Sequence, residues 1–155
     1  MIAVIGCGNP NRSDDGAGPA VVRMLEARGL SGDTVKLLDA GTDGMAVMFA
    51  ARGCNKLIIV DACKSGSEPG AIFEVPGERL EAPHQSALNL HDFRWEHALF
   101  AGRKLYGSSF PKDVAVLLIE AATLEYGIGL SPLVAASVEK TARRIAALIP
   151  ERTAA

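Results

Sequence analysis

Five short apolar runs, rich in β-branched residues or leucine, recur along the 155-residue chain and constrain its fold more than any other feature. They lie at residues 2–5, 34–38, 56–60, 71–75 and 113–119. Continuous apolar runs of this length are typical of strands that are covered on both faces. The helix-like patterns between and after them span about residues 18–28, 44–52, part of 85–105 and 131–149. Strands that alternate with helices predict a largely parallel sheet between two layers of helices.

The segment Ser65-Gly66-Ser67-Glu68-Pro69-Gly70 indicates the direction of the fourth predicted strand. It is too short to be a linker and rich in turn-forming residues, so the fourth strand can return antiparallel to its neighbour. We therefore expect the α/β class, as a three-layer sandwich with about five strands in a mostly parallel, twisted sheet and one antiparallel strand. We predict a single domain at residues 1–150 and a frayed tail at 151–155.

Composition excludes several classes of partner. Lys plus Arg number 16 against 18 for Asp plus Glu, and aromatic residues make up 5% of the chain, so neither a positive field nor a stacking surface for nucleic acid is expected. The run 114–119 is about a third of the ~20 apolar residues that a membrane helix needs, so no membrane association is expected. Three cysteines without a C-x-x-C pair favour a reducing environment, and we expect a cytoplasmic protein.

Carboxylates follow the first three predicted strands. Asp14 and Asp15 follow the first strand, Asp39 the second and Asp61 the third. In a doubly wound sheet the ligand crevice lies beyond the carboxyl ends of the strands, so these are the first candidates for a site. Pro19 places the start of the first helix just after Asp14 and Asp15, which can therefore also serve as caps or partners of the helix dipole. For Asp61 the alternative role is a turn or a helix cap.

All three histidines, His84, His91 and His97, fall in one short stretch. If that stretch is one helix, His84 and His91 share a face, whereas His91 and His97 diverge by about 120°, so all three cannot converge. Two carboxylates and one imidazole suit a divalent transition metal with open coordination positions. Cys7 and Cys63 could also reach such a metal, but we expect both to be small buried apolar residues. A site this incomplete would bind metal better if another molecule completed the shell.

Several motifs, in this order and at this spacing, resemble one known family. They are Gly6-x-Gly8-Asn9, Asp14-Asp15-Gly16-x-Gly18, Asp39-x-Gly41-Thr42, Ile58-Ile59-Val60-Asp61-Ala62 and Gly127-Ile128-Gly129-Leu130-Ser131-Pro132. Together with the late histidine segment, they make the chain similar to the hydrogenase maturation endopeptidases over essentially its whole length. These proteases act on the large subunit of nickel-iron hydrogenases.

The resemblance implies a fold, an activity and a partner. The fold would be phosphorylase/hydrolase-like. Family members remove a short C-terminal extension from the large-subunit precursor after nickel insertion, and the nickel in the precursor is the recognition signal. The nickel would then be carried by the substrate, the protein would hold no tightly bound cofactor of its own, and its partner would be the precursor. We expect the protein to be a monomer.

The resemblance also assigns roles to individual residues. Asp15 and Asp61 match the family's metal-contacting acids and are the predicted catalytic pair, although many members carry glutamate where this chain has Asp15. The third metal contact is a histidine. We predict His91, because it directly precedes the helix-like run that begins at Trp95, and His84 is the alternative, since some members carry Pro-His-Gln at this ligand.

The turn after the second predicted strand is a candidate substrate-binding segment. Asp39, Gly41 and Thr42 are predicted to shape the cleft or contact the precursor, and the alternative is an ordinary strand-to-helix loop with a cap. Arg12 can pair with a carboxylate of the substrate, but we expect it to be solvated.

Two other functions remain open from the sequence. The Gly6-x-Gly8 motif and Asp39 imitate a dinucleotide-binding fingerprint. However, Asn11 stands where the third glycine would be, and Asp14 and Asp15 would place negative charge where phosphates need the helix N-terminus. A non-catalytic nickel-site chaperone is the second alternative, because a protein that only binds nickel could use the same three metal ligands as an enzyme.

Overall fold

The structure is a computed structural model that describes residues 1–85 and 92–151. Its strands and α-helices follow one another in the order β1 (Ile2–Cys7), α1 (Ala17–Ala27), β2 (Val35–Gly41), α2 (Gly44–Ala51), β3 (Lys56–Cys63), β4 (Ile72–Pro76), α3 (Trp95–Tyr106), β5 (Asp113–Glu120) and α4 (Pro132–Leu148). The predicted strands and helices are all present at these positions, with ends that shift by a few residues. Among the described residues, no helix is both long and apolar enough to span a membrane.

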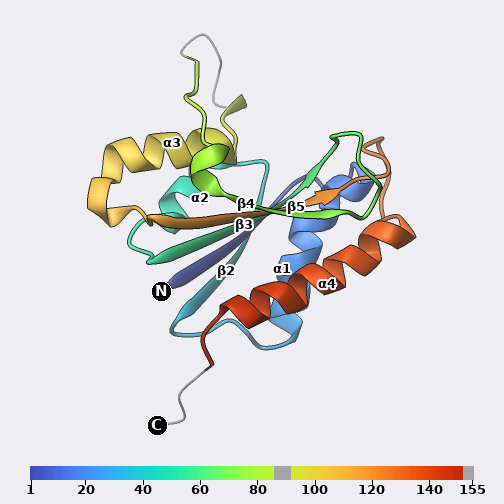
Figure 1. The fold of residues 1–155 in the computed structure, drawn as a ribbon, viewed down its shortest axis with the longest axis horizontal. Helices are drawn as coiled ribbons and strands as arrows, with labels where there is room; N and C mark the ends of the chain where they lie inside the picture. The colour runs from blue at the N-terminus through green and yellow to red at the C-terminus, as the bar shows by residue number, and fades with distance from the viewer. Residues whose placement is uncertain (86–91, 152–155) are drawn as a thin grey trace.

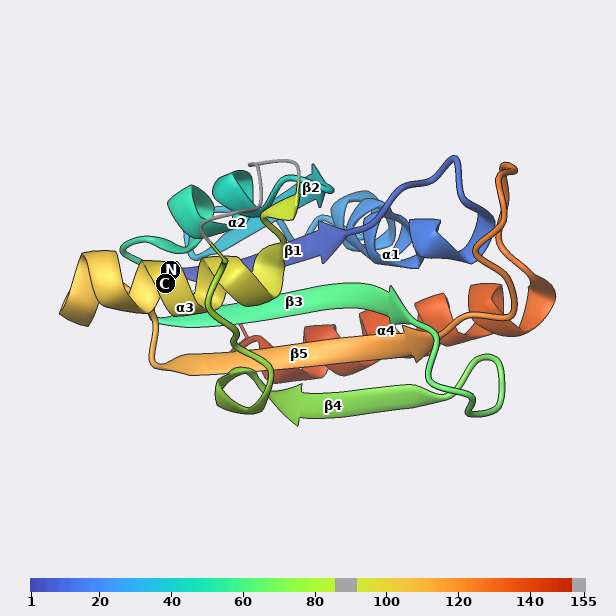
Figure 2. The same cartoon turned by 90° about the horizontal axis from the view of Figure 1, so that it is seen from above.

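The sheet has the strand order β2-β1-β3-β5-β4 (Figure 2). β1 pairs in parallel with β2 and β3, and β3 pairs in parallel with β5. β4 lies at the edge and runs antiparallel to β5, as the short turn before it predicted. The predicted five-stranded, mostly parallel sheet with one antiparallel strand is therefore confirmed.

Two layers of helices cover the sheet, with α1 and α4 on one face and α2 and α3 on the other (Figure 1). The alternation of side chains along a strand explains how one apolar run serves both faces. In β3, Leu57 and Ile59 pack in the core beneath α2 and α3, whereas Ile58 and Val60 pack in the core beneath α1 and α4. The next residue, Asp61, therefore faces the side of α3, which places its carboxylate beneath the start of that helix.

The topology opens a crevice between β1 and β3. The chain leaves β1 through α1 to reach β2 on one side, and returns through α2 on the opposite face to form β3 on the other side. This is the switch point at which doubly wound sheets bind ligands. Gly18 allows α1 to start against the sheet here, because a Cβ at this position would meet the carbonyl oxygens of Cys7 and Val60.

Two expectations about local structure were wrong. β3 does not end at Val60, because its pairing with β5 continues to Cys63, so Asp61 lies within the strand. Pairing of β3 with β1 stops at Val60, so the main chain of Asp61 has no partner in β1, although its side chain is buried. The helix of the histidine segment begins only at Trp95, so His84 is not helical and the shared helical face with His91 does not exist. His91 and most of the predicted tail lie outside the described residues.

Candidate active site

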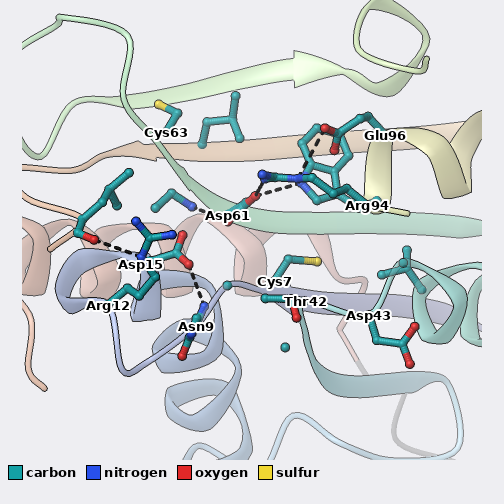
Figure 3. A pocket seen from close by; sticks show the side chains of 18 of the residues that line it. Cys7, Asn9, Arg12, Asp15, Thr42, Asp43, Asp61, Cys63, Arg94 and Glu96 are labelled. Carbon is teal, nitrogen blue, oxygen red and sulfur yellow. Dashed lines mark hydrogen bonds and ion pairs between the residues drawn. The ribbon is translucent and has the colours of Figure 1, made fainter. Parts of the chain in front are cut away.

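A cleft of about 780 Å³ lies at the carboxyl ends of β1, β2 and β3. Its polar side chains come from the loop after β1, from β3 and its following loop, and from the start of α3. They are Asn9, Arg12, Asp15, Asp61, Lys64, Asp92, Arg94 and Glu96, together with the turn residues Thr42 and Asp43. Figure 3 shows Asp15 and Asp61 as neighbours in this cleft, with Arg12 beside Asp15 and Arg94 beside Asp61. The two acids predicted as the catalytic pair thus lie in one cleft.

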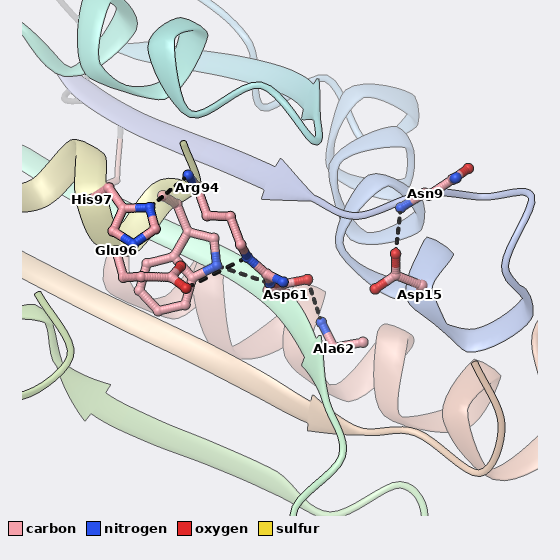
Figure 4. Close-up of polar contacts among 8 residues, drawn as sticks. Asn9, Asp15, Asp61, Ala62, Arg94, Glu96 and His97 are labelled. Atoms are coloured by element: carbon pink, nitrogen blue, oxygen red, sulfur yellow. Dashed lines mark hydrogen bonds and ion pairs between the residues drawn. The ribbon is translucent and has the colours of Figure 1, made fainter. Parts of the chain in front are cut away.

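Asp61 is buried and held by two short hydrogen bonds. The indole Nε1 of Trp95 donates to its Oδ2 at 2.8 Å, and the amide of Ala62 donates to its Oδ1 at 2.8 Å (Figure 4). Arg94 Nη2 lies 3.4 Å from Oδ2. Burial raises the pKa of Asp61 to about 7, and the negative charge of Asp15 adds to the rise, whereas the contacts from Trp95 and Arg94 oppose it. A carboxyl group with this pKa can accept or release a proton near neutral pH.

Asp15 is positioned by the tight 3-10 turn Ser13–Gly16 that precedes α1. Its Oδ2 accepts a hydrogen bond from the amide of Asn9 at 2.8 Å, which joins the two ends of the loop after β1 (Figure 4). The side chain is half-buried at the cleft wall. Asp15 and Asp61 line the same cleft, and the charge of Asp15 contributes to the raised pKa of Asp61.

Asp14, the neighbour of Asp15, has a different role from those considered for it. Its carboxylate is fully buried and accepts hydrogen bonds from the Ser131 amide at 2.7 Å, the Ser131 hydroxyl at 2.9 Å, the Ala122 amide at 2.9 Å and the Thr123 amide at 3.2 Å. It neither caps α1 nor lines the cleft. Asp14 instead joins the loop after β1 to the loop between β5 and α4, and so fixes the turn that carries Asp15.

The two described histidines pack together outside the cleft. The His84 ring lies edge-on to Phe93 and His97, with centroid separations of 5.3 and 5.2 Å, and His84 is not among the cleft-lining residues. His97 Nδ1 accepts a hydrogen bond from the Arg94 amide at the start of α3. Within residues 1–85 and 92–151, no group of three His, Cys, Asp or Glu side chains could hold a metal ion. His91, the predicted third ligand, lies outside these residues.

The predicted substrate-binding turn divides into two parts. Gly41 and Thr42 line the cleft, whereas Asp39 does not. The Asp39 carboxylate accepts a hydrogen bond from the Gly41 amide at 3.0 Å and so shapes the turn from outside. Asp43 caps α2 by accepting from the amides of Met45 and Ala46, which is the cap expected for a strand-to-helix loop.

Neither cysteine of the cleft is suited to act as a thiolate. Burial raises the pKa of Cys7 well above its ordinary value, and the charge of Asp61 adds to the rise. Burial also raises the pKa of Cys63 to about 12, with a further contribution from Glu120, whose carboxylate accepts a hydrogen bond from the Cys63 thiol. Cys63 is therefore not the simple buried apolar residue that we expected. Both thiols stay protonated at neutral pH, so neither is an activated nucleophile.

Sequence reasoning missed the start of α3 as part of the site. Trp95 is the only tryptophan of the chain, and with Arg94 and Glu96 it forms one wall of the cleft. A lone tryptophan flanked by opposite charges was the available signal, but the segment was considered only as a helix. Arg12 is exposed, as expected, and its Nε also donates to the carbonyl of Leu124 at 3.1 Å.

Comparison with known proteins identifies the family. The family model described as hydrogenase maturation protease, HycI, matches residues 19–148, which is most of the chain. The chain belongs to the hydrogenase maturation protease family. The resemblance drawn from the motifs is thereby confirmed, and the protein is an enzyme of the peptidase class that hydrolyses peptide bonds.

Individual members of the hydrogenase maturation protease family cover nearly the whole chain. The Hydrogenase 2 maturation protease of Escherichia coli K12 is 31% identical over 151 residues, which span 97% of this chain and 91% of that protein. The structure of the hydrogenase maturating endopeptidase HybD from E. coli superposes with a TM-score of 0.80 at 28% identity, covering 96% of this chain and 91% of that one. HybD from Thermococcus kodakarensis gives a TM-score of 0.77 at 25% identity, covering 97% and 99%.

Proposed function

We propose that this protease removes the C-terminal extension of a nickel-iron hydrogenase large-subunit precursor after nickel insertion, and that it recognises the nickel held by the precursor. Asp15, Asp61 and His91 complete the coordination of that metal, which brings the scissile peptide bond to the cleft. The observation that carries the proposal is the pair Asp15 and Asp61, which come from different elements and share one cleft at the switch point of the sheet. Family membership supplies the peptidase activity.

The donor set of this chain supports nickel as a substrate-borne metal. Carboxylate oxygens and one imidazole leave coordination positions open for soft ligands. The protein's own thiols, Cys7 and Cys63, are held protonated by burial. We assign the thiolate ligands to the precursor, and removal of the extension would let the precursor close over its metal and dissociate.

The chemistry required of the site is hydrolysis of one peptide bond. A water molecule, activated by the substrate-borne metal or by a carboxylate of the cleft, attacks the scissile carbonyl carbon. Asp61 is held beneath the start of α3 by the Trp95 indole and the Ala62 amide, so its carboxylate is fixed in the cleft where the metal and the scissile bond would meet. Gly41 and Thr42 would contact the precursor chain, because they line the cleft, and Asp39 would support their turn from outside. We further propose that the protein acts as a monomer in the cytoplasm.

The two rival functions are less well supported. A dinucleotide would need free main-chain amides at the loop after β1, but the Asn9 amide already donates to the Asp15 carboxylate, which also repels phosphate. A nickel-site chaperone without catalysis would use the same acids. Membership in a protease family favours catalysis over this alternative.

The test is a processing assay with precursor in nickel-loaded and nickel-free forms. Mass spectrometry of the precursor should show a discrete C-terminal mass loss only with the nickel-loaded form. Asp61→Asn should abolish cleavage, and Glu74→Gln, which alters an exposed carboxylate on the edge strand β4, should not. If the wild type binds the nickel-loaded precursor without cleaving it, the protease proposal is wrong and the chaperone remains. If both precursor forms are cleaved equally, nickel is not the recognition signal.

A further inference from the structure

Three cationic side chains line the described cleft, and two of them are already engaged. Arg12 Nε donates to the Leu124 carbonyl at 3.1 Å, and its guanidinium lies 5.4 Å from the centre of the Tyr126 ring. Lys64 Nζ donates to the carbonyls of residues 121 and 122 at 3.2 and 3.0 Å. Both cations are therefore anchored to the loop that follows β5, Lys64 through two hydrogen bonds and Arg12 through one. The third cation is Arg94.

Arg94 combines an anchored backbone with a loosely held guanidinium. Its amide donates to His97 Nδ1 at 3.0 Å, and the next residue, Trp95, is fixed to Asp61 at 2.8 Å. Its guanidinium lies 3.4 Å from Asp61 Oδ2 and 3.5 Å from Glu96 Oε1. Charge-assisted hydrogen bonds are usually about 2.7–2.9 Å long, so both contacts are weak. The side chain is also 60% exposed, so donors of the guanidinium remain available to a ligand in the cleft.

The main-chain amides beside the two acids are already used. The amide of Gly8 donates to the Gly41 carbonyl, that of Asn9 to Asp15, and that of Ala62 to Asp61. The first amides of α2 are also occupied, since Asp43 accepts from two of them and the Gly44 amide donates to the carbonyl of residue 93. Peptide hydrolysis requires donors aimed at the oxygen that becomes negatively charged. These backbone groups cannot supply them without giving up existing hydrogen bonds.

We propose that the Arg94 guanidinium stabilises the oxyanion formed from the scissile carbonyl. The inference rests on the proposed function. The water oxygen bonds to the carbonyl carbon, one water proton passes to a cleft carboxylate, and the π electron pair moves to the carbonyl oxygen, which accepts hydrogen bonds from Arg94. Collapse of this intermediate re-forms the carbonyl and breaks the C–N bond. The leaving nitrogen takes the electron pair and that proton, which gives a carboxylic acid and an amine. The remaining acid proton then passes to the amine, which leaves a carboxylate and an ammonium group.

The position of Arg94 suits this role because it lies beside Asp61 without being bound tightly to it. Arg94 lies beside Asp61, one of the two acids proposed to hold the metal in the cleft. A substrate carbonyl held next to that acid would therefore lie within reach of the exposed guanidinium, and a fixed cation stabilises an oxyanion there. Arginine has five donors in a planar fork, so it can bind an oxyanion while keeping one contact to a carboxylate.

The experiment compares Arg94→Gln and Arg94→Lys with the wild type in steady-state cleavage of nickel-loaded precursor. Removal of one oxyanion donor usually lowers kcat about 10²–10³-fold, so Arg94→Gln should show a loss of this order with KM changed less than about threefold. Arg94→Lys should recover part of the loss, because the charge is kept. Arg144→Gln is the matched control, since Arg144 pairs with exposed Glu74 on the far edge of the sheet and should leave both constants unchanged.

Each outcome decides for or against the inference. An unchanged kcat for Arg94→Gln overturns it, and so does a raised KM with unchanged kcat, which would make Arg94 a ground-state binding residue. A larger kcat loss for Thr42→Val than for Arg94→Gln would give the oxyanion to the Thr42 hydroxyl instead. If the wild type itself fails to cleave, the proposed function and this inference fall together. If the wild type cleaves and Asp61→Asn does not, a result against Arg94 leaves the proposed function intact.

Discussion

Substitution of Asp14 by asparagine should destabilise the protein far more than the same change at Asp15. The Asp14 carboxylate is fully buried and accepts four hydrogen bonds from the loop between β5 and α4. Burial alone would raise the pKa of Asp14, but the hydrogen bonds from Ser131, Ala122 and Thr123 outweigh burial and lower it. The folded protein therefore favours the charged carboxylate over a neutral group of the same shape.

The size of the effect follows from these contacts. In the best orientation, the asparagine carbonyl keeps the three donors that now face Oδ2, and its amide group opposes the Ser131 amide that now donates to Oδ1. One charge-assisted bond, about 1.5–3 kcal/mol, is lost, and the other three weaken because the acceptor is neutral. We expect Asp14→Asn to lower the free energy of unfolding by about 3–5 kcal/mol, which is a large part of the ~5–15 kcal/mol of a typical domain.

Equilibrium unfolding in urea measures this change. Trp95, the only tryptophan, is buried and reports unfolding by fluorescence. The effect should shrink in acid, because the pKa of Asp14 is lowered: its contribution is present above the ordinary value of 3.8 and is lost as pH falls through the folded value. Asp15→Asn is the matched control, which should lose cleavage but cost less than about 1.5 kcal/mol, since one hydrogen bond from Asn9 is affected. A stability for Asp14→Asn within about 0.5 kcal/mol of the wild type would refute the reasoning.

Three further changes test other parts of the structure. Glu120→Gln should destabilise the protein at pH 7, because the buried carboxylate accepts hydrogen bonds from the main-chain amides of residues 65–67. These and other hydrogen bonds outweigh burial and lower the pKa of Glu120 to about 2. In acid-unfolding curves the difference in stability from the wild type should therefore fade as pH drops from 4.5 towards 2. Gly18→Ala should lower the free energy of unfolding by more than about 2 kcal/mol, because the added Cβ meets one carbonyl oxygen of β1 and one of β3. A Tm like that of the wild type in thermal unfolding would contradict the close approach of α1 to the sheet. Trp95→Phe keeps an aromatic ring but is smaller and removes the indole donor to Asp61. Thermal unfolding followed by circular dichroism should show a loss of at least about 1.5–3 kcal/mol, and cleavage should slow. Unchanged cleavage would show that this bond does not position the carboxylate.

The layers and strand positions could be predicted because they depend on local patterns. The runs of the central strands β1 and β3 and of β5 are largely buried, whereas the edge strands β2 and β4 are partly exposed. The short turn 65–70 leads into the antiparallel edge strand β4. The ends of elements were less predictable, because they depend on which neighbour a strand meets. β3 continues to Cys63 because β5 pairs with it that far, although its pairing with β1 stops at Val60.

The acids of the site could be located, but their surroundings could not. Asp15 and Asp61 were identified from their places after predicted strands and from the family resemblance. Nothing local indicates that Asp61, on β3, receives a hydrogen bond from Trp95, 34 residues later on α3. The role of Asp14 was equally hidden, because its partners lie 108 to 117 residues away in the loop before α4.

The sequence by itself determined the α/β class, the single antiparallel strand, the family and the two acids of the cleft, because these follow from periodicity, turn chemistry and motif spacing along the chain. The tertiary structure alone decided which charges face one another: Arg94 beside Asp61, Asp14 turned away from the cleft, and His84 packed against Phe93. The physical reason is that hydrogen bonds, burial and pKa values depend on distances between segments far apart in the chain. Those distances are set by how the helices pack on the two faces of the sheet.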